Sequence, residues 1–419
     1  MRNIFDQYSQ PENKLTHALV TALHEDRKLL GKFVRWVTGM APPAKSINIV
    51  EQRLPGDPES NETDYSRQGL PDAWIYSDDD WSLIIENKVS ATLTRDQLNR
   101  HLATANRRGF TKVTLLVVDV AEPKFKLPKG SIFKSWPDIY EWLYKQSGWS
   151  YWAGKVCEYM DVAESKWPDD NYLKEGTLTK FSGIPFDNDN PYSYLEAKRL
   201  IKLIMAELRS HTALNKQLGM DPVAPGRGMI TGKNASLVWD CLRLKAFDHE
   251  KDFVKTVHLT VGIQSERVVA IIIVPNSIKR SLRNRLFQDG YEGFEELFRQ
   301  VHRNINKTVG KVKGVESYVD VLQRHYRTQK SQPTVDARQT FSLDTAFPSK
   351  NSDVKHQPIW LESAYELLAN KKGNTQLGVG AVFSYANCPS VKSPKIVESI
   401  ANTWLACKPL IDVILDKQK

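Results

Sequence analysis

Two extended runs on either side of a short acidic turn constrain the fold of this chain more than any other feature. The runs cover residues 70–76 and 81–88, and Ser77-Asp78-Asp79-Asp80 lies between them, which predicts a β-hairpin. A predicted helix at 94–108 follows, and residues 113–118 then form a continuous apolar run. Such a run is typical of a strand buried on both faces. The sequence therefore predicts a sheet covered by helices.

The other elements of the N-terminal part complete this arrangement. Helices are predicted at 11–24, 29–37 and 137–145, and strands at 47–54 and 132–136. We therefore assign residues 1–165 to an α/β domain in which helices flank a mixed sheet.

A polar segment separates this domain from the rest of the chain. Residues 166–191 are rich in Pro, Asp and Asn, which predicts a linker. Beyond it we predict a separate α+β domain at 192–419. Its predicted helices are at 192–210, 294–309 and 395–415, and its predicted strands at 236–243, 256–264, 267–274 and 376–385.

The register of the predicted hairpin brings charged side chains together. If residues 78–80 form the loop, pairing sets Asp72 opposite Glu86, and Lys88 projects on the same face as Glu86. Adjacent carboxylates repel unless a cation lies between them, and Mg²⁺ takes one or two carboxylates plus waters and phosphate. The Asn87 carbonyl is a further candidate ligand, and Lys88 is placed to act on the phosphate or the attacking water. The alternative is an ordinary surface salt bridge.

Pro71-Asp72 followed by Glu86-Asn87-Lys88 resembles the PD-(D/E)XK signature of the restriction-endonuclease-like nucleases. Glu12, in the leading helix, resembles the upstream acidic residue that many members place beside the metal. Gln97, in the helix after the hairpin, resembles a glutamine that some members use near the site. The resemblance covers about residues 1–150 and nothing beyond.

The resemblance implies a restriction-endonuclease-like fold and a Mg²⁺-dependent endodeoxyribonuclease, for which Mn²⁺ can substitute. It also implies restriction or anti-phage defence as the setting, with DNA as a partner and a homo-oligomer or a defence-system protein as a further one. The implied catalytic residues are Asp72, Glu86, Lys88, Glu12 and Gln97, and the implied metal ligands are Asp72, Glu86, Asn87 and Glu12. The alternatives are an RNA nuclease and a non-catalytic module that binds or senses nucleic acid or protein.

The excess positive charge of the chain lies in its second part. Residues 1–165 contain 21 Lys and Arg against 22 Asp and Glu, whereas residues 166–419 contain 37 against 27. This asymmetry favours a polyanionic partner, although a solvated basic surface explains it equally well. The candidate nucleic-acid contacts are Lys279, Arg280, Arg283, Arg285, Arg299, Arg303 and Lys307.

Other functional classes lack their sequence patterns. Four scattered cysteines without a CxxC pair argue against a disulfide framework or a thiolate zinc site. There is no GxxxxGK[ST] or HExxH motif, so a P-loop ATPase and a zinc protease are not expected. No apolar run approaches the roughly 20 residues that span a bilayer, and no secretory pattern is visible. We therefore expect a cytoplasmic protein without membrane contact.

Overall fold

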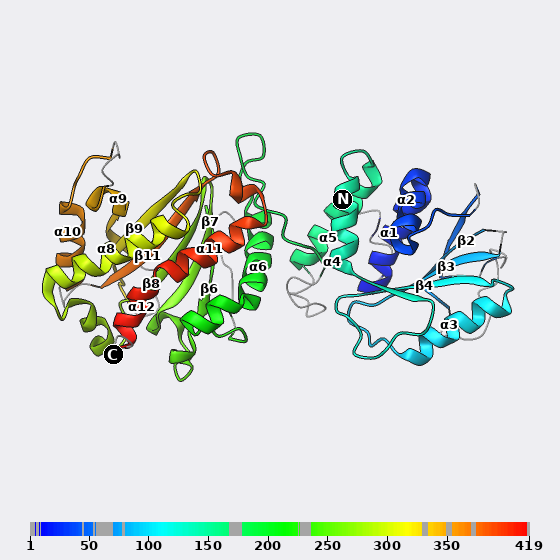
Figure 1. Ribbon diagram of the computed structural model, residues 1–419, viewed down its shortest axis with the longest axis horizontal. Helices are drawn as coiled ribbons and strands as arrows, with labels where there is room; N and C mark the ends of the chain where they lie inside the picture. The colour runs from blue at the N-terminus through cyan, green and yellow to red at the C-terminus, as the bar shows by residue number, and fades with distance from the viewer. Residues whose placement is uncertain are drawn as a thin grey trace. The chain divides into compact units, whose positions relative to one another are not determined.

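The computed structural model describes residues 5, 8, 10–43, 46–52, 55, 70–77, 80–166, 178–224, 226, 236–328, 334–348, 354–369 and 374–416. The chain divides into two compact units, Met1–Lys180 (unit 1) and Phe181–Lys419 (unit 2) (Figure 1). The boundary lies within the segment predicted as a linker. Each unit combines one sheet with several helices, which confirms the predicted mixture of helix and strand.

Unit 1 contains a five-stranded mixed sheet with the order β1-β2-β3-β4-β5. The strands are β1 (Asn48–Glu51), β2 (Ala73–Ser77), β3 (Trp81–Asn87), β4 (Lys112–Asp119) and β5 (Ser131–Ser135). The first three pair antiparallel, whereas β4 lies parallel to both β3 and β5. The apolar β4 is therefore an interior strand, as its sequence predicts.

Helices cover both faces of this sheet. One face packs against α1 (Pro11–Glu25), α2 (Arg27–Thr38), α4 (Trp136–Gln146) and α5 (Tyr151–Lys166), and the other against α3 (Arg95–Arg107). Period-two alternation decides which residue faces which layer, so Ile75 joins the four-helix side and Trp74 the α3 side. The Thr94 hydroxyl accepts a hydrogen bond from the Gln97 amide at 3.3 Å and caps α3, as predicted.

The β2–β3 pairing has the predicted register. Ser77 pairs with Trp81 and Ala73 with Ile85, so one further step sets Asp72 opposite Glu86. The predicted loop residues 78 and 79 lie outside the described residues. Glu86 follows Ile84 on the face that packs against α3. The hairpin therefore directs Glu86 towards this helix.

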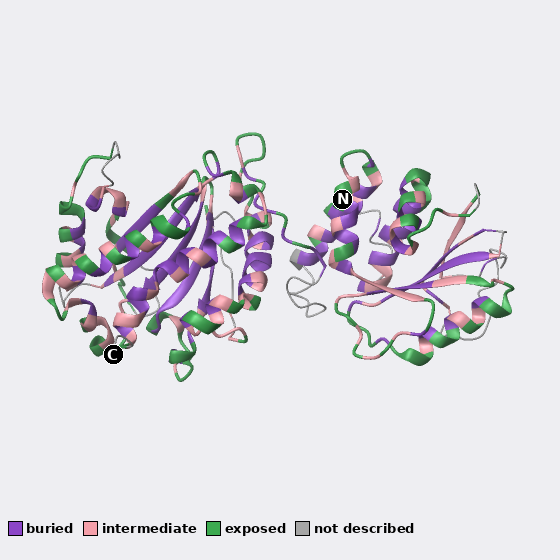
Figure 2. Ribbon diagram, in the orientation of Figure 1, coloured by how far each residue is buried: buried purple, intermediate pink, exposed green. Residues whose placement is uncertain are grey.

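Unit 2 contains a six-stranded antiparallel sheet with the order β10-β9-β11-β8-β7-β6. Its strands are β6 (Leu237–Arg243), β7 (His258–Gln264), β8 (Arg267–Val274), β9 (Val315–His325), β10 (Thr334–Phe341) and β11 (Thr375–Ser384). Its helices are α6 (Tyr194–Ser210), α7 (Arg280–Asn284), α8 (Gly290–Thr308), α9 (Leu343–Ala346), α10 (Ile359–Ala369), α11 (Lys395–Ala406) and α12 (Lys408–Leu415). The longer helices and one sheet face enclose the main core, to which both helices and strands contribute buried residues (Figure 2).

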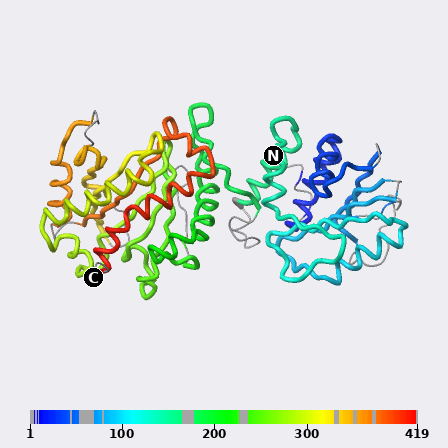
Figure 3. The backbone as a smooth tube through the Cα atoms, in the orientation of Figure 1, coloured from blue at the N-terminus to red at the C-terminus, as the bar shows by residue number. Residues whose placement is uncertain are grey.

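Several elements of unit 2 differ from the sequence prediction. The closing helix predicted at 395–415 is two helices, α11 and α12, because Pro409 lacks the amide that a continuous helix would need. The elements β9, β10 and α10 were not predicted, nor was α5 of unit 1. The predicted linker is packed in part: Phe181, Ile184 and Phe186 lie in the core of unit 2, whereas residues 188–191 are exposed. Figure 3 shows the course of the backbone through unit 2. Residues 167–177 lie outside the described residues.

All four cysteines are buried and unbridged. Unit 1 holds Cys157, and unit 2 holds Cys241, Cys388 and Cys407. Burial raises the pKa of the Cys157 and Cys407 thiols to about 12. These thiols therefore stay protonated at neutral pH.

Candidate active site

Glu86 lies near the end of β3, where three predicted site residues meet. Its side chain is only 1% exposed, and Oε1 accepts hydrogen bonds from Lys88 Nζ and Gln97 Nε2, both at 2.6 Å. Lys88 follows two residues later along the chain, and Gln97 comes from the first turn of α3. The alternation of β3 and the docking of α3 together hold this carboxylate between two donors.

Asp72 lies immediately before β2, beside the same strand end. Its Oδ2 accepts a hydrogen bond from the Asn87 amide at 2.6 Å, which ties it to the residue next to Glu86. Burial and the negative charge of Glu86 raise the pKa of Asp72 to about 7, against the opposing effects of the Asn87 amide and Lys88. A cation beside the two carboxylates would relieve their repulsion.

The Lys88 ammonium interacts with three carboxylates. Burial by itself lowers its pKa, but Glu86, Asp72 and Glu12 together raise the pKa above its ordinary value. The Lys88 amide donates to the Val118 carbonyl at 2.8 Å, so its backbone is anchored to β4. Lys88 is therefore a fixed and protonated cation at neutral pH.

Glu12 reaches the loop after β3 from the first turn of α1. Its Oε1 accepts hydrogen bonds from the Ser90 and Ala91 amides at 3.0 and 2.9 Å and from the Ser90 hydroxyl at 3.0 Å. Burial raises its pKa, but these hydrogen bonds outweigh burial and the net pKa is lowered. Glu12 is therefore an ionised carboxylate whose field acts on Asp72 and Lys88.

The side chain of Asn87 faces α1 rather than the carboxylates. Its Nδ2 donates to Thr16 Oγ1 at 2.6 Å, and the Thr16 hydroxyl in turn donates to the Glu12 carbonyl at 2.9 Å. The main-chain carbonyl of Asn87 stays a predicted ligand.

Sequence reasoning missed two residues near this site. His101 lies one helical turn after Gln97 and is fully buried, with Nε2 3.0 Å from Glu86 Oε2 but without hydrogen-bond geometry. The i, i+4 spacing from Gln97 was the available signal. Asp119 ends β4, and burial raises its pKa while the charges of Lys88 and Glu12 act on it in opposite directions.

The carboxylate oxygens at this site are suitable ligands for a hard divalent cation. Asp72 and Glu86 supply oxygen ligands, and Mg²⁺ typically binds one or two carboxylates while keeping several waters. Across the described ranges, no group of three or more Asp, Glu, His or Cys side chains is arranged to hold a metal. Two carboxylates leave the other coordination positions of a Mg²⁺ ion to waters and to a substrate phosphate.

Two of the basic residues predicted to contact nucleic acid make structural contacts in unit 2. Arg283 donates to the carbonyls of Thr375 at 2.8 Å and Leu368 at 3.2 Å, and Arg285 donates to the Ile414 carbonyl at 2.7 Å. Their charged groups bind strand and helix ends.

The other predicted contacts lie on more exposed surface. Arg299 and Arg303 form ion pairs with Glu296 on their own helix. Lys279, Arg280 and Lys307 are exposed. Contact of these residues with nucleic acid stays a prediction.

Comparison with known proteins gave no relative. No protein-family model matches the chain, and no curated protein matches it significantly. In the part of the chain that the structure describes, no helix has the length and apolar character to cross a bilayer.

Proposed function

We propose that this protein is a Mg²⁺-dependent nuclease of the PD-(D/E)XK type that hydrolyses phosphodiester bonds in DNA. The observation that carries the proposal is the convergence of charged groups at the end of β3. Asp72 is tied to the strand beside Glu86, and Lys88 and Gln97 both bind the Glu86 carboxylate. Burial, followed by the charge of Glu86, raises the pKa of Asp72, and a carboxylate perturbed in this way beside other charged groups is a candidate for a functional site.

Each residue has a distinct role in this proposal. Asp72 and Glu86 hold the cation, with the Asn87 main-chain carbonyl as a further ligand. Glu12, which is bound to the loop after β3, adds negative charge near them. When bound, Mg²⁺ supplies Lewis-acid stabilisation of phosphate charge and lowers the pKa of its water. Lys88 stabilises charge on the phosphate or orients the attacking water, and Gln97 keeps the Glu86 carboxylate in position.

Unit 2 supplies target binding or regulation in this proposal. Residues 181–419 contain 34 Lys and Arg against 24 Asp and Glu, whereas residues 1–180 contain 24 against 25. A basic unit in the same chain as a nearly neutral unit supports a polyanionic substrate. The resemblance in unit 1 supports restriction or anti-phage defence in the cytoplasm as the setting, with a homo-oligomer or a defence-system protein as partner.

A cleavage assay tests the proposal. Purified full-length protein is incubated with plasmid, linear duplex and single-stranded DNA and with RNA, in Mg²⁺, Mn²⁺ or EDTA. We expect DNA cleavage in either metal, no cleavage in EDTA, and none by Asp72→Asn. The matched control is Asp96→Asn, an equally small change at an exposed position on α3, which should leave cleavage intact.

One observation favours the alternative, a non-catalytic binding module on the same scaffold. Glu86 Oε1 already has two protein donors and Oε2 lies beside His101, so this carboxylate has cationic and polar neighbours without a metal. Metal-independent binding of nucleic acid without cleavage of any substrate would establish that alternative and overturn the nuclease proposal.

A further inference from the structure

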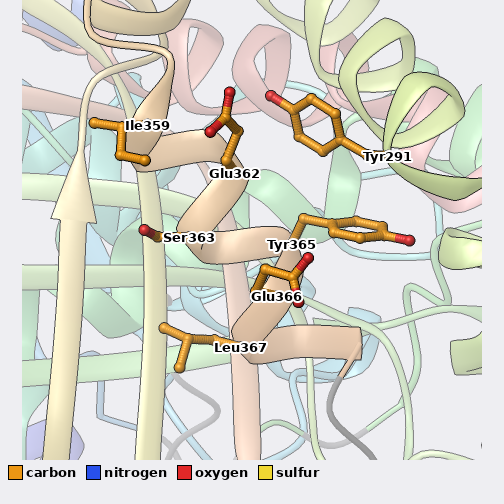
Figure 4. Close-up of a pocket in the computed structure, with 7 residues that line it drawn as sticks. All are labelled: Tyr291, Ile359, Glu362, Ser363, Tyr365, Glu366 and Leu367. Atoms are coloured by element: carbon orange, nitrogen blue, oxygen red, sulfur yellow. The ribbon is translucent and has the colours of Figure 1, made fainter.

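A groove in unit 2 lies between helices α8 and α10, on elements that the proposed nuclease chemistry does not use. Its volume is about 670 Å³, and six of its lining residues are Tyr291, Ile359, Glu362, Tyr365, Glu366 and Leu367. Figure 4 shows the rings of Tyr291 and Tyr365 and the carboxylates of Glu362 and Glu366 on the side of α10 that faces α8.

Aromatic rings form a firm wall of this groove. The Tyr365 ring packs edge-to-face against Tyr291, Phe294 and Phe287, with centroid separations of 5.5, 5.4 and 5.8 Å. Phe294 belongs to the main core of unit 2, so the rings are backed by packed side chains. Ring faces and edges in such a cluster present a fixed surface to a ligand, and ring faces attract cations.

Carboxylates give the groove a charge opposite to that of its unit. Glu362 and Glu366 are exposed, and neither forms an ion pair within the described residues, whereas Glu296 on α8 is paired with arginines. Burial, followed by the charges of Glu295 and Glu362, raises the pKa of Tyr291 to about 12 against the opposing charge of Arg299. A negative groove on a unit with ten excess basic residues is a local reversal of charge.

Exposed apolar side chains lie along the same helix. Ile359 is 55% exposed, Trp360 43% and Leu367 42%, an unusual density of large apolar surface on one short helix. Exposed apolar patches rimmed by polar residues commonly mark protein–protein contacts. Apolar side chains next to unpaired carboxylates and tyrosines therefore call for a ligand that is both apolar and cationic.

We propose that the α8–α10 groove is a docking site for a partner protein's segment that carries arginine flanked by apolar residues. A guanidinium stacks on the tyrosine rings and pairs with the Glu362 and Glu366 carboxylates, because it offers a planar face and several donors. The flanking apolar residues cover Ile359 and Leu367, which line the groove. The basic surface elsewhere on unit 2 repels such a segment, so charge directs it to this groove.

A defined peptide tests the proposal with the full-length protein. The probe is a fluorescein-labelled hexapeptide of alternating leucine and arginine, and its binding is followed by fluorescence anisotropy at low salt. A second peptide carries citrulline, which has the shape of arginine without its charge. We expect the arginine peptide to bind about tenfold more tightly than the citrulline peptide, and more weakly as salt rises.

Matched variants locate the binding. The double variant Glu362→Gln/Glu366→Gln should weaken arginine-peptide binding about tenfold, and Tyr291→Ala should weaken it as well. Glu316→Gln/Glu398→Gln makes the same change in net charge on β9 and α11 and should leave binding unchanged. Equal binding by both double variants, equal affinity for both peptides, or no binding by the wild type would each overturn the proposal.

Discussion

At the residue scale, the Lys88 ammonium has one near partner and two more distant ones. It bonds Glu86 Oε1 at 2.6 Å, while Asp72 and Glu12 act on it through charge. A cation held by Asp72 and Glu86 would compete with Lys88 for the Glu86 oxygen. We therefore expect metal binding to turn the ammonium from Glu86 towards the substrate phosphate.

This competition gives a first prediction. Asp72→Asn and Glu86→Gln should each abolish metal-dependent cleavage, because each removes a charged ligand. Lys88→Met should also abolish cleavage but leave metal binding intact or tighter, because the ammonium repels the cation. Calorimetric Mn²⁺ titration and a cleavage assay on the same preparations separate the two effects. Weakened metal binding in Lys88→Met would contradict this assignment.

His101 gives a second prediction. We expect His101→Leu to lower cleavage by about 10-fold or more, since removing a group that positions a metal ligand typically has this effect. His101→Gln keeps a side-chain donor and should recover part of the rate. Circular dichroism checks that both variants fold. Equal rates in the two variants would assign His101 a packing role alone.

Part of this site was predictable residue by residue. The alternation of β3 and the hairpin register were enough to bring Asp72, Glu86 and Lys88 together, because both follow from local pairing rules. His101 was not found, because the contact depends on how α3 docks on the sheet. The partners of Arg283 were not predictable either, since Leu368 and Thr375 lie far along the chain.

At the element scale, the turn between α8 and β9 depends on a glycine with no room for a side chain. Gly314 has φ +77°, and an added Cβ would lie 2.3 Å from the Asn387 carbonyl carbon. Gly219 has a similar φ of +68° but open space around it. Comparing substitutions at the two glycines therefore separates the cost of backbone strain from the cost of steric overlap with the added Cβ.

The third prediction compares these two glycines. Gly219→Ala should cost roughly 1–2 kcal/mol of unfolding free energy, the usual cost of a left-handed alanine. Gly314→Ala should cost roughly 3 kcal/mol or more, because the Asn387 backbone must also move. Urea denaturation of both variants measures the difference. Equal losses of unfolding free energy in the two variants would mean that the loop after β11 shifts at little energetic cost.

The fourth prediction concerns His258 at the start of β7. Burial lowers the pKa of His258 from 6.5 to about 4, although Nδ1 donates a hydrogen bond to the Thr256 carbonyl at 2.8 Å, which raises the pKa. Between pH 4 and 6.5 the unfolded chain binds a proton here that the folded chain does not. The free energy of unfolding should therefore fall as the pH falls through this window, by up to about 3 kcal/mol.

Denaturation of His258→Gln across pH 4–8 checks this effect. Glutamine does not titrate, so the variant should lose much less stability than the wild type on acidification. His249→Gln, at an exposed position nearby, should keep the wild-type dependence. An unchanged pH dependence in His258→Gln would show that another group controls it.

Element prediction succeeded where the pattern was local and failed where packing decided. The helices α1 and α3 and the strands β3 and β4 carry clear periodicity and end signals. The edge strand β10 is exposed along most of its length and has a register shift between Val335 and Ala337, so its short apolar alternation was a weak signal. The groove helix α10 exposes apolar residues, so its sequence lacks the clear division into an apolar and a polar face that predicts a surface helix.

At the scale of the whole molecule, the two units differ in charge and each has its own core. Unit 1 needs more chain than the predicted domain of residues 1–165. The Glu164 carboxylate accepts hydrogen bonds from the Leu178 and Thr179 amides at 2.6 and 2.8 Å. A fragment that stops at residue 165 removes both donors from a buried carboxylate.

The fifth prediction follows from this division. Residues 1–180 should fold alone but bind DNA weakly, because they contain no excess positive charge. The full chain should lose affinity with salt, with a log–log slope of about −0.9 for each phosphate neutralised. Filter binding or anisotropy over a salt series measures both. The same affinity and slope for fragment and full chain would place the DNA-binding surface in unit 1.

The four buried cysteines allow the local opening of each unit to be measured separately. A buried thiol reacts with an alkylating reagent only after the structure around it opens, so the labelling rate measures local opening. Cys157 reads unit 1, whereas Cys241, Cys388 and Cys407 read unit 2. A ligand that stabilises one unit slows alkylation of the cysteines in that unit only, whereas a ligand that stabilises both units slows alkylation in both. Peptide mass spectrometry after timed alkylation therefore distinguishes the two cases without any engineered label.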